Sequence, residues 1–372
     1  MGLLGAGSEQ REALPRPGLG RLQVEGFRGG GRLLAPTLGR RGSYLQPWRA
    51  RDAGAVAIGS AAQGGPVSTV THTELPGLTC LHRGKVRDVY VVDDATLLFV
   101  ATDRISAFDR ILGSGIPGKG VVLTQASRFW FEHFAEQVPT HLVTGRAADM
   151  PASIQSLARE LGGRAMLVRR AEVVPIECVV RGYLAGSVAA AYARDGAIQG
   201  VALPAGIPLG GELPQPIFTP TTKAASGHDL PLTYAELEGS VGAELAATLR
   251  ETALRVFGLA SAHCRERGLL LCDTKFEFGR LPDGRLVLVD EALTPDSSRF
   301  FRADRHTPGE QPQPWDKQLV RDWLLAHPEV KDGEAPPALP AEVVAETAER
   351  YATVYAMLSG RPLADAVAEA IA

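Results

Sequence analysis

The residues best suited to chemistry are charged side chains set inside apolar runs. In one run, Asp273, Lys275 and Glu277 alternate with mostly apolar residues, and Asp290 ends a second run shortly afterwards. In a strand, the first three charges would share one face. Carboxylates gathered in this way suit a divalent cation such as magnesium, which prefers oxygen ligands. The alternative is a solvated hairpin face, on which charges are common.

The spacing of the two runs predicts a hairpin that turns at residues 282–284. If Asp283 and Gly284 are the two central turn residues, Glu277 lies opposite Asp290, with Cβ atoms roughly 5 Å apart. A three-residue loop would shift that register by one. Opposed carboxylates repel each other unless a proton or a cation lies between them, so this register favours a metal site.

A second apolar segment carries Glu177, Arg181 and, beyond two glycines, Ser187. The planar fork of an arginine binds phosphate or carboxylate in a bidentate way. Gly182 and Gly186 would let backbone amides approach the same anion. The segment therefore indicates an anion site, and a buried ion pair between Glu177 and Arg181 is the alternative.

A third group of cations begins a predicted hairpin over residues 84–100. Lys85 and Arg87 follow Gly84 and fall on one face of the first strand. Such a pair could cover the phosphates of a nucleotide, as glycine-rich hairpins do in kinases. A single glycine is a weak signal, so two surface cations are the alternative.

Glycines also gather at residues 113–120, ahead of a predicted helix over residues 124–134. The glycines predict a loop with unusual dihedral angles. This loop could be an anion nest with Lys119 as its counter-charge, or a flexible connection.

Together with residues 218–229 and 315–323, these motifs resemble the SAICAR synthetase family in both type and order, from about Thr69 onwards. The resemblance implies a carbon-nitrogen ligase of de novo purine synthesis. Such a ligase uses ATP, with magnesium, to join the carboxylate of carboxyaminoimidazole ribonucleotide (CAIR) to the amine of L-aspartate. The products are SAICAR, ADP and phosphate. The oligomeric state stays open.

The resemblance also implies roles for individual residues. Lys85, Arg87 and Lys119 match contacts to ATP, and Glu277 and Asp290 match carboxylates around magnesium and the substrate carboxylate. Lys275 matches a lysine near the reacting groups, which makes it catalytic together with those two carboxylates. The implied substrate-binding residues are Arg181, Ser187, Arg299, Lys223, Asp229, Arg104 and Ser106. The group that takes the proton from the aspartate amine is not assigned.

The implied fold is α+β with two lobes and an ATP cleft between them, similar to that of ATP-grasp enzymes. The smaller antiparallel β lobe is expected over residues 67–165, and the larger α/β lobe over residues 166–372. Thr233 and Glu236 form a capping box at the start of a predicted helix that ends near Gly268. Two apolar stripes at helical spacing are expected to be core. They are Val241, Leu245, Leu249, Thr252, Val256 and Leu259, and later Val343, Val344, Thr347, Tyr351, Val354, Tyr355 and Leu358.

The composition fits a cytoplasmic enzyme of small molecules. The chain has 372 residues, a formal charge of −3 and 45% hydrophobic residues, which suffices for a large core and does not demand a nucleic-acid partner. It has no apolar run long enough to span a bilayer, so a membrane role is unsupported. Four cysteines show no metal spacing and are expected to be reduced and buried: Cys80, Cys178, Cys264 and Cys272.

Residues 1–66 differ from the rest in being rich in glycine and arginine, without a period that would bury a face. An organellar transit peptide would have such a composition and would place the enzyme in a plastid. The other interpretation is upstream sequence translated from a start placed too early. We favour the second, because Val67 leads directly into the start of the family resemblance. The segment is then expected to be disordered and dispensable.

Overall fold

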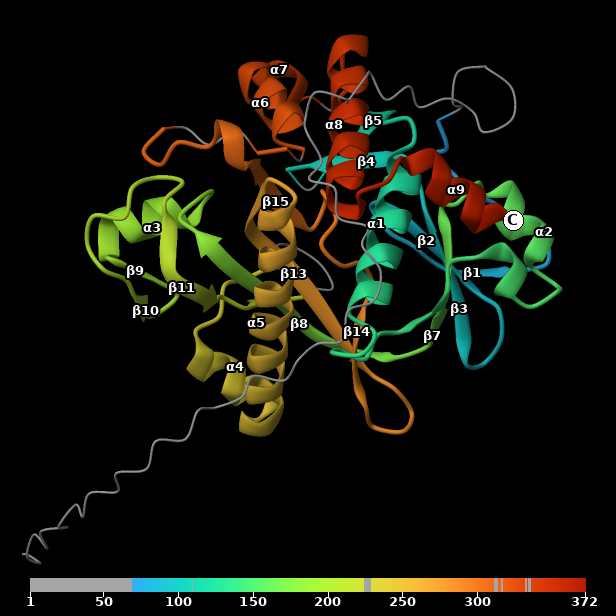
Figure 1. Ribbon diagram of the computed structural model, residues 1–372, viewed down its shortest axis with the longest axis horizontal. Coiled ribbons are helices and arrows are strands. Elements are labelled where there is room, and N and C mark those ends of the chain that lie inside the picture. Colours follow the sequence, from blue (N-terminus) through green and yellow to red (C-terminus); the bar gives the residue numbers. More distant parts are fainter. Residues whose placement is uncertain are drawn as a thin grey trace, which may run out of the picture. The chain divides into compact units, whose positions relative to one another are not determined.

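Two antiparallel sheets with helices packed on them make up the described part of the chain (Figure 1). The computed structural model describes residues 69–108, 110–223, 229–310, 314–315, 317–331, 333 and 336–372. The extension predicted to be disordered, residues 1–66, lies outside the described residues. Mixed helices and antiparallel strands confirm the predicted α+β class.

The first sheet has five strands in the order β1-β2-β3-β7-β6. The hairpin predicted over residues 84–100 is confirmed as β2 and β3, and Asp93 accepts hydrogen bonds from the backbone amides of Ala95 and Thr96 at its turn. The strands are β1 (Thr79–Arg83), β2 (Arg87–Val91), β3 (Thr96–Ala101), β6 (Leu142–Thr144) and β7 (Ala165–Arg169).

The second sheet has six strands, with β8 and β13 at its centre. Its main order is β11-β8-β13-β14, while β12 pairs with β8 and β15 pairs with β13. The strands are β8 (Glu172–Tyr183), β11 (Glu212–Phe218), β12 (Thr221–Thr222), β13 (Leu269–Arg280), β14 (Leu286–Val289) and β15 (Ser298–Arg302). Two short ribbons complete the strands: β4 (Arg104–Ala107) with β5 (Arg110–Gly115), and β9 (Ala197–Ile198) with β10 (Val201–Ala202).

The longest helix of the described residues, α5, packs along β8 and β13, whereas α1 packs on β3 and β7 (Figure 1). Helices α8 and α9, from the end of the chain, pack against α1. The helices are α1 (Lys119–His133), α2 (Gln155–Glu160), α3 (Val188–Asp195), α4 (Tyr234–Val241), α5 (Ala243–Glu266), α6 (Gln318–Ala326), α7 (Pro328–Lys331), α8 (Ala341–Ser359) and α9 (Leu363–Ile371). Short 3-10 turns occur at Ala147–Asp149 and Ala303–Arg305. None of these helices combines the length and the apolarity needed to cross a bilayer.

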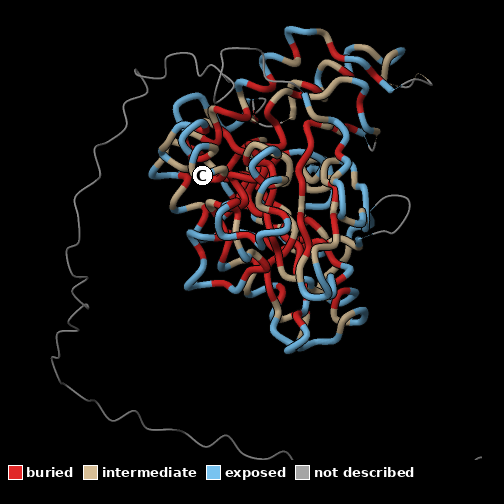
Figure 2. Tube along the Cα trace, turned by 90° about the vertical axis from the view of Figure 1, so that its right-hand side faces the viewer, coloured by how far each residue is buried: buried red, intermediate tan, exposed pale blue. Residues whose placement is uncertain are grey.

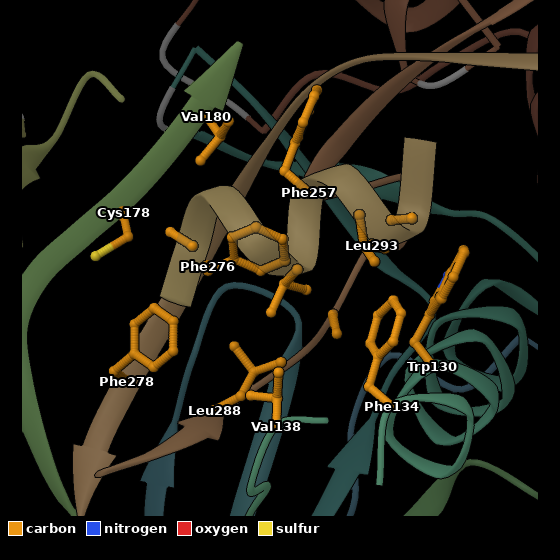
Figure 3. Packing of buried hydrophobic residues seen from close by; sticks show 14 of the residues in the cluster. Trp130, Phe134, Val138, Cys178, Val180, Phe257, Phe276, Phe278, Leu288 and Leu293 are labelled. Carbon is orange, nitrogen blue, oxygen red and sulfur yellow. The ribbon is translucent and has the colours of Figure 1, made fainter. Parts of the chain in front are cut away.

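A continuous hydrophobic core joins the two sheets (Figure 3). Trp130 of α1, Phe257 of α5 and Phe276 of β13 belong to one buried cluster, which also includes Leu97 of β3 and Val168 of β7. Figure 2 shows these buried segments gathered inside the fold. Because Phe276 and Phe278 point into this core, the residues between them on β13 face the opposite side. The core therefore fixes the position of the charged face of β13.

The helix predicted from Thr233 to Gly268 is two helices. The capping box of Thr233 and Glu236 is confirmed at the start of α4. Gly242, with a φ of 85°, then interrupts the helix, and α5 begins at the next residue. The predicted core stripe is correct at Leu249 and Val256 but wrong at Leu259, which is 39% exposed. The break turns α5 so that a row of smaller residues, with Phe257, faces the sheet instead.

The stripe near the end of the chain is confirmed in α8, where every member except the half-buried Val344 is buried. None of the four cysteines, all of which lie in the described residues, forms a disulfide, in agreement with the predicted reduced state. Cys178, Cys264 and Cys272 are buried, but Cys80 is only half-buried because β1 is the edge strand of its sheet. How the chain divides into lobes stays a prediction. The strand β7 crosses the expected boundary at residues 165 and 166, and it pairs with β3.

Helix α1 begins at Lys119, five residues earlier than predicted, so the glycine segment 113–120 is not one loop. Its first part completes β5. Gly118 takes a φ of 76° immediately before the helix. A Cβ added to Gly120 would lie 2.1 Å from the carbonyl oxygen of Ala101. Glycine is thus required at position 120 by the close packing of α1 on β3.

Candidate active site

The register of the central strands brings two arginines to Asp273. On β13, Asp273 pairs with Arg181 of β8 on one side and with Arg299 of β15 on the other. Arg181 donates from Nη1 to Asp273 Oδ2 at 2.8 Å. Arg299 donates from Nε to Oδ1 at 2.9 Å and from Nη2 to Oδ2 at 2.6 Å. One carboxylate therefore orients two guanidinium groups, with a net positive charge left over.

The loop between β8 and α3 closes one side of this cluster. Gly186 has a φ of 69°, and a Cβ there would lie 2.0 Å from Nη1 of Arg299. Only glycine combines a favourable positive φ with the lack of a Cβ, so the backbone can lie close to the guanidinium group of Arg299. Ser187 follows as the exposed N-cap of α3. The loop thus brings Gly186 against Arg299, whereas the anion site expected at Arg181 and Ser187, with Arg299 as a further contact, stays a prediction.

Further along the same face of β13, two carboxylates oppose each other. Glu277 pairs in register with Glu177 of β8, and Lys275 contacts both. Lys275 Nζ donates to Glu277 Oε1 at 3.2 Å and also bonds Glu177. Lys223 bonds the other oxygen of Glu277. The alternative of an ion pair between Glu177 and Arg181 is wrong, because β13 supplies a different partner to each of them.

The lysines determine the charge of these carboxylates. Burial alone would raise the pKa of Glu277, but Lys275 and Lys223 hold it below its usual value. In turn, burial would lower the pKa of Lys275, and the two glutamates outweigh that effect and raise it. Glu277 and Lys275 therefore both stay ionised at neutral pH, as an ion pair.

The β13–β14 hairpin has the shifted register. Leu281 and Arg285 close a three-residue loop, so Glu277 lies opposite Val289 and not opposite Asp290. The proline at 282 makes a three-residue turn, which moves the pairing by one position. Asp290 instead follows β14 with a φ of 66°, a strained conformation for a residue with a side chain.

Asp290 and Glu291 meet the cation of the first sheet. Arg87 donates from Nη2 to Asp290 at 2.6 Å and from Nη1 to Glu291 at 3.0 Å. The pKa of Asp290 is raised to about 6, first by burial and then by the nearby charges of Glu277 and Glu291, against the opposing effect of Arg87. Asp290 is thus a carboxylate whose negative charge is only partly compensated.

A cavity of about 400 Å³ opens between the two sheets at this point. Its apolar wall includes Phe99, Leu97, Ala171 and Val173, which suit a flat ring. Its charged end is lined by Lys85, Arg87, Lys223, Glu277 and Asp290. Two of the three predicted ATP contacts, Lys85 and Arg87, therefore line one cavity with the predicted metal carboxylates. Its size is that of a small-molecule site.

A smaller cavity of about 170 Å³ lies along the other part of the face of β13. Arg181, Asp273, Arg299 and Lys275 line it, together with Asp296 and Arg321. Lys275 lines this cavity, and its hydrogen-bond partner Glu277 lines the larger one. The ion pair of these two residues thus marks the place where the cavities adjoin.

Five predicted site residues line neither cavity, and one of them is the exposed Ser187. Arg104 bonds the backbone oxygens of Gly84 and Lys85, so it supports the cationic hairpin from behind. Ser106 is half-buried in the β4–β5 ribbon, and Asp229 is exposed. Lys119 is fully buried and lies 2.7 Å from Asp296. The ligand roles of these five residues stay predictions.

Several residues of the site have no role in the sequence-based prediction. Asp273 and Glu177 each lie on the charged face of a predicted strand. That alternation was the signal that could have identified them as site residues. Asp296 is held from behind by Lys119 and by the hydroxyl of Tyr351, which donates at 2.6 Å. These partners lower the pKa of Asp296 against the effect of burial, and their distance along the chain leaves no local signal. Arg321 comes from α6, and its spacing alone could not place it here.

The described residues contain no group of three or more acidic, histidine or cysteine side chains able to hold a metal by themselves. Magnesium, however, is commonly bound by one or two carboxylates together with substrate phosphates. Glu277 and Asp290 line one cavity, and the charge of Glu277 raises the pKa of Asp290. A cation beside them would relieve that repulsion, so the donor set fits magnesium bound with a nucleotide.

The likeness to known proteins covers most of the chain. The SAICAR synthetase family model matches residues 80–337. A phosphoribosylaminoimidazole-succinocarboxamide synthase of Syntrophobacter fumaroxidans is 46% identical over 300 residues, which are 80% of this chain and 99% of that protein. The synthase of Saccharopolyspora erythraea is 50% identical over 286 residues, which are 76% of this chain and 94% of that protein.

Solved structures agree with the sequence relatives. The Saccharomyces cerevisiae SAICAR synthase in complex with SAICAR matches with a TM-score of 0.71 and 39% identity, over 79% of this chain and 99% of that one. The resemblance inferred from the motifs is confirmed. The chain belongs to the SAICAR synthetase family.

Proposed function

We propose that the larger cavity binds ATP, that the smaller one binds CAIR and L-aspartate, and that phosphoryl transfer occurs where they adjoin. The chain is an ATP-dependent ligase of purine synthesis that forms SAICAR, ADP and phosphate, the reaction of its family. The observation that supports the assignment best is the ion pair of Lys275 and Glu277, since each residue lines one of the two cavities.

The chemistry requires that the substrate carboxylate be activated. An oxygen of the CAIR carboxylate attacks the γ-phosphorus of ATP, and the bond from that phosphorus to the β-phosphate oxygen breaks to release ADP. The amine of L-aspartate then attacks the activated carbonyl carbon and loses a proton. Phosphate leaves with the carboxylate oxygen, and an amide bond remains. Several negative charges meet in the first step, so the site must supply cations around them.

Individual residues supply these charges. We assign the ATP phosphates to Lys85 and Arg87, at the charged end of the larger cavity. We assign the ribonucleotide phosphate to Arg181 and Arg299, which line the smaller cavity, and to Ser187 at the start of α3. Lys275 lies between the two anion sites, where it can stabilise the group in transfer.

Glu277 and Asp290 would hold magnesium. When bound, the cation offsets negative charge on the phosphate oxygens. Arg87 keeps Asp290 in place at 2.6 Å, and Lys223 and Lys275 keep Glu277 ionised. The carboxylates are thus oriented by Arg87 of β2, by Lys223 after β12 and by Lys275 on β13 itself before any ligand enters.

We also propose a cytoplasmic location, because four free cysteines are characteristic of proteins from reducing compartments. Fluorescent tagging of the full chain would test it, and accumulation of the tagged chain in an organelle would contradict it.

The assignment is tested by measuring ADP release from the full chain with ATP, magnesium and CAIR, with and without L-aspartate. The ligase should release ADP at full rate only with L-aspartate and should form SAICAR in equal amount. ADP release at the same rate without L-aspartate would indicate a kinase instead.

A further inference from the structure

Arg321 differs from the other cations of the smaller cavity. Arg181 and Arg299 are bonded to Asp273, and Lys275 is bonded to two glutamates. Within the described ranges, the Arg321 side chain has no hydrogen bond or ion pair, although it is half-buried and lines the cavity. An unpaired, half-buried guanidinium is unfavourable unless a ligand supplies the anion.

The fold determines where Arg321 lies. Its neighbour Val320 is fully buried, and so is Leu324 one turn later, both in a cluster with Ile105 and Leu112 of the β4–β5 ribbon. This packing fixes the face of α6 that meets the core, and Arg321 then points toward the cavity beside Asp296. Its place is therefore set by core packing and not by contact with other charges.

The charges of the cavity leave room for a further anion. Asp273 carries one negative charge against two arginines, and Lys119 balances Asp296. Lys275 and Lys223 balance Glu177 and Glu277. Lys317 also acts on Asp296 but does not line the cavity. Among the cations that line it, two positive charges remain, one on the arginine pair at Asp273 and one on Arg321. They come from different elements, β8 with β15 and α6, which indicates two separate anionic groups.

The substrates of the proposed function bring four anionic groups besides ATP. The ribonucleotide phosphate is assigned to Arg181 and Arg299, and the reacting carboxylate must face the nucleotide cavity near Lys275. The two carboxylates of L-aspartate then remain without an assigned partner. Arg321 is the arginine of this cavity to which no anionic group has been assigned. The planar fork of arginine suits bidentate binding of a carboxylate.

We propose that Arg321 binds a carboxylate of the amino-acid substrate and so selects L-aspartate. This inference rests on the proposed function of the cavity. Arg321 would position the amine for attack by holding the rest of the molecule, and it would take no part in ATP binding.

The test compares steady-state kinetics of the full chain carrying Arg321→Met or Arg321→Lys. The KM for L-aspartate should rise about 10- to 100-fold in Arg321→Met, the usual effect of a lost charge-assisted hydrogen bond. Arg321→Lys should give a smaller rise, because it keeps the charge and loses the fork. The KM values for ATP and CAIR should stay within about twofold.

Arg255→Met, at an exposed position of α5, is the matched control and should leave all three constants unchanged. An unchanged KM for L-aspartate in Arg321→Met, or a rise confined to the KM for CAIR, would overturn the inference. An equal loss with all substrates and a lower melting temperature would also overturn it, because that outcome indicates a structural role. A failure of the proposed function is distinct, since the unmodified chain would then show no aspartate-dependent turnover.

Discussion

Glu177 and Glu277 face each other across neighbouring strands, and Lys275 bonds both of them. Two carboxylates in direct register would repel each other without this ammonium group. Lys275 is therefore a structural counter-ion that also lines the smaller cavity. Its proposed role in the reaction would make one side chain serve both the sheet and the chemistry.

Replacement of Lys275 should affect activity and stability together. In Lys275→Met the two glutamates lose their shared partner, so we expect about 2 to 4 kcal/mol less stability toward urea. We expect kcat to fall at least about 100-fold, because the transferred group loses a nearby positive charge. Urea unfolding and steady-state assays measure the two effects. A variant with wild-type kcat would contradict the proposed role, whereas Lys275→Arg should recover most of the stability.

Replacement of Glu277 should act mainly through the metal. Glu277→Ala should raise the magnesium concentration needed for half-maximal turnover at least about tenfold, because one of two carboxylate ligands is lost. The same change at Asp290 should have a similar effect. Magnesium titrations at saturating ATP measure this, and circular dichroism checks folding. Loss of folding in proportion to activity would favour a purely structural pair of carboxylates.

Asp290 should give the metal-free enzyme a characteristic pH dependence. Its pKa is raised to about 6 in the folded state, above the usual carboxyl value near 4, so the folded state binds this proton more tightly than the unfolded state. The contribution to stability is thus largest below about pH 4 and is lost as the pH rises through 6.

Asp290→Asn removes this titration. With chelator present, its stability relative to the unmodified chain should therefore increase between pH 4 and pH 7, by up to about 3 kcal/mol for a shift of two pKa units. Urea unfolding at both pH values measures the difference. A relative stability that is constant over this range would refute the assignment.

Lys119 offers a test between two roles. The family resemblance implies a contact to ATP, whereas its ammonium group is fully buried 2.7 Å from Asp296. Lys119→Met leaves a buried carboxylate without its counter-ion, which should cost about 3 to 5 kcal/mol of stability. We expect the double variant Lys119→Met with Asp296→Asn to recover part of that loss. A large rise in the KM for ATP with unchanged stability would instead support the nucleotide contact.

Residues 1–66 should be dispensable for the reaction. The family relatives are matched over 94–100% of their length by 76–80% of this chain, and the family model begins at residue 80. A chain of residues 67–372 should therefore keep kcat and all KM values within about twofold. Its activity and melting temperature are compared with those of the full chain. Loss of either would show that the extension takes part in folding or catalysis.

Much of the site was predictable because it lies on strands. Period two placed Asp273, Lys275 and Glu277 on one face, and the hairpin after Gly84 placed Lys85 and Arg87 together. The sequence at 282–284 allows two loop lengths and left the register open between them, and the structure has the three-residue loop. The local sequence pattern could not predict which residues pair across strands, such as Glu177 with Glu277. Those depend on which strands pair and in which register.

The bounds of the helices were less predictable where a glycine determines them. Gly242 ended one helix and started another, and Gly120 served close packing inside a helix that was expected to begin later. The burial of Lys119 follows from that earlier start, since the first turn of α1 faces Asp296 and α8. Arg321 lacked any signal because its position depends on how α6 packs against a distant ribbon.

The most direct test of the account follows one oxygen atom. CAIR labelled with ¹⁸O in its carboxylate is turned over with ATP, magnesium and L-aspartate, and the released phosphate is analysed by mass spectrometry. If the substrate carboxylate is activated by phosphoryl transfer, the phosphate should carry one ¹⁸O atom from CAIR. Phosphate without the label, released together with SAICAR, would contradict the account.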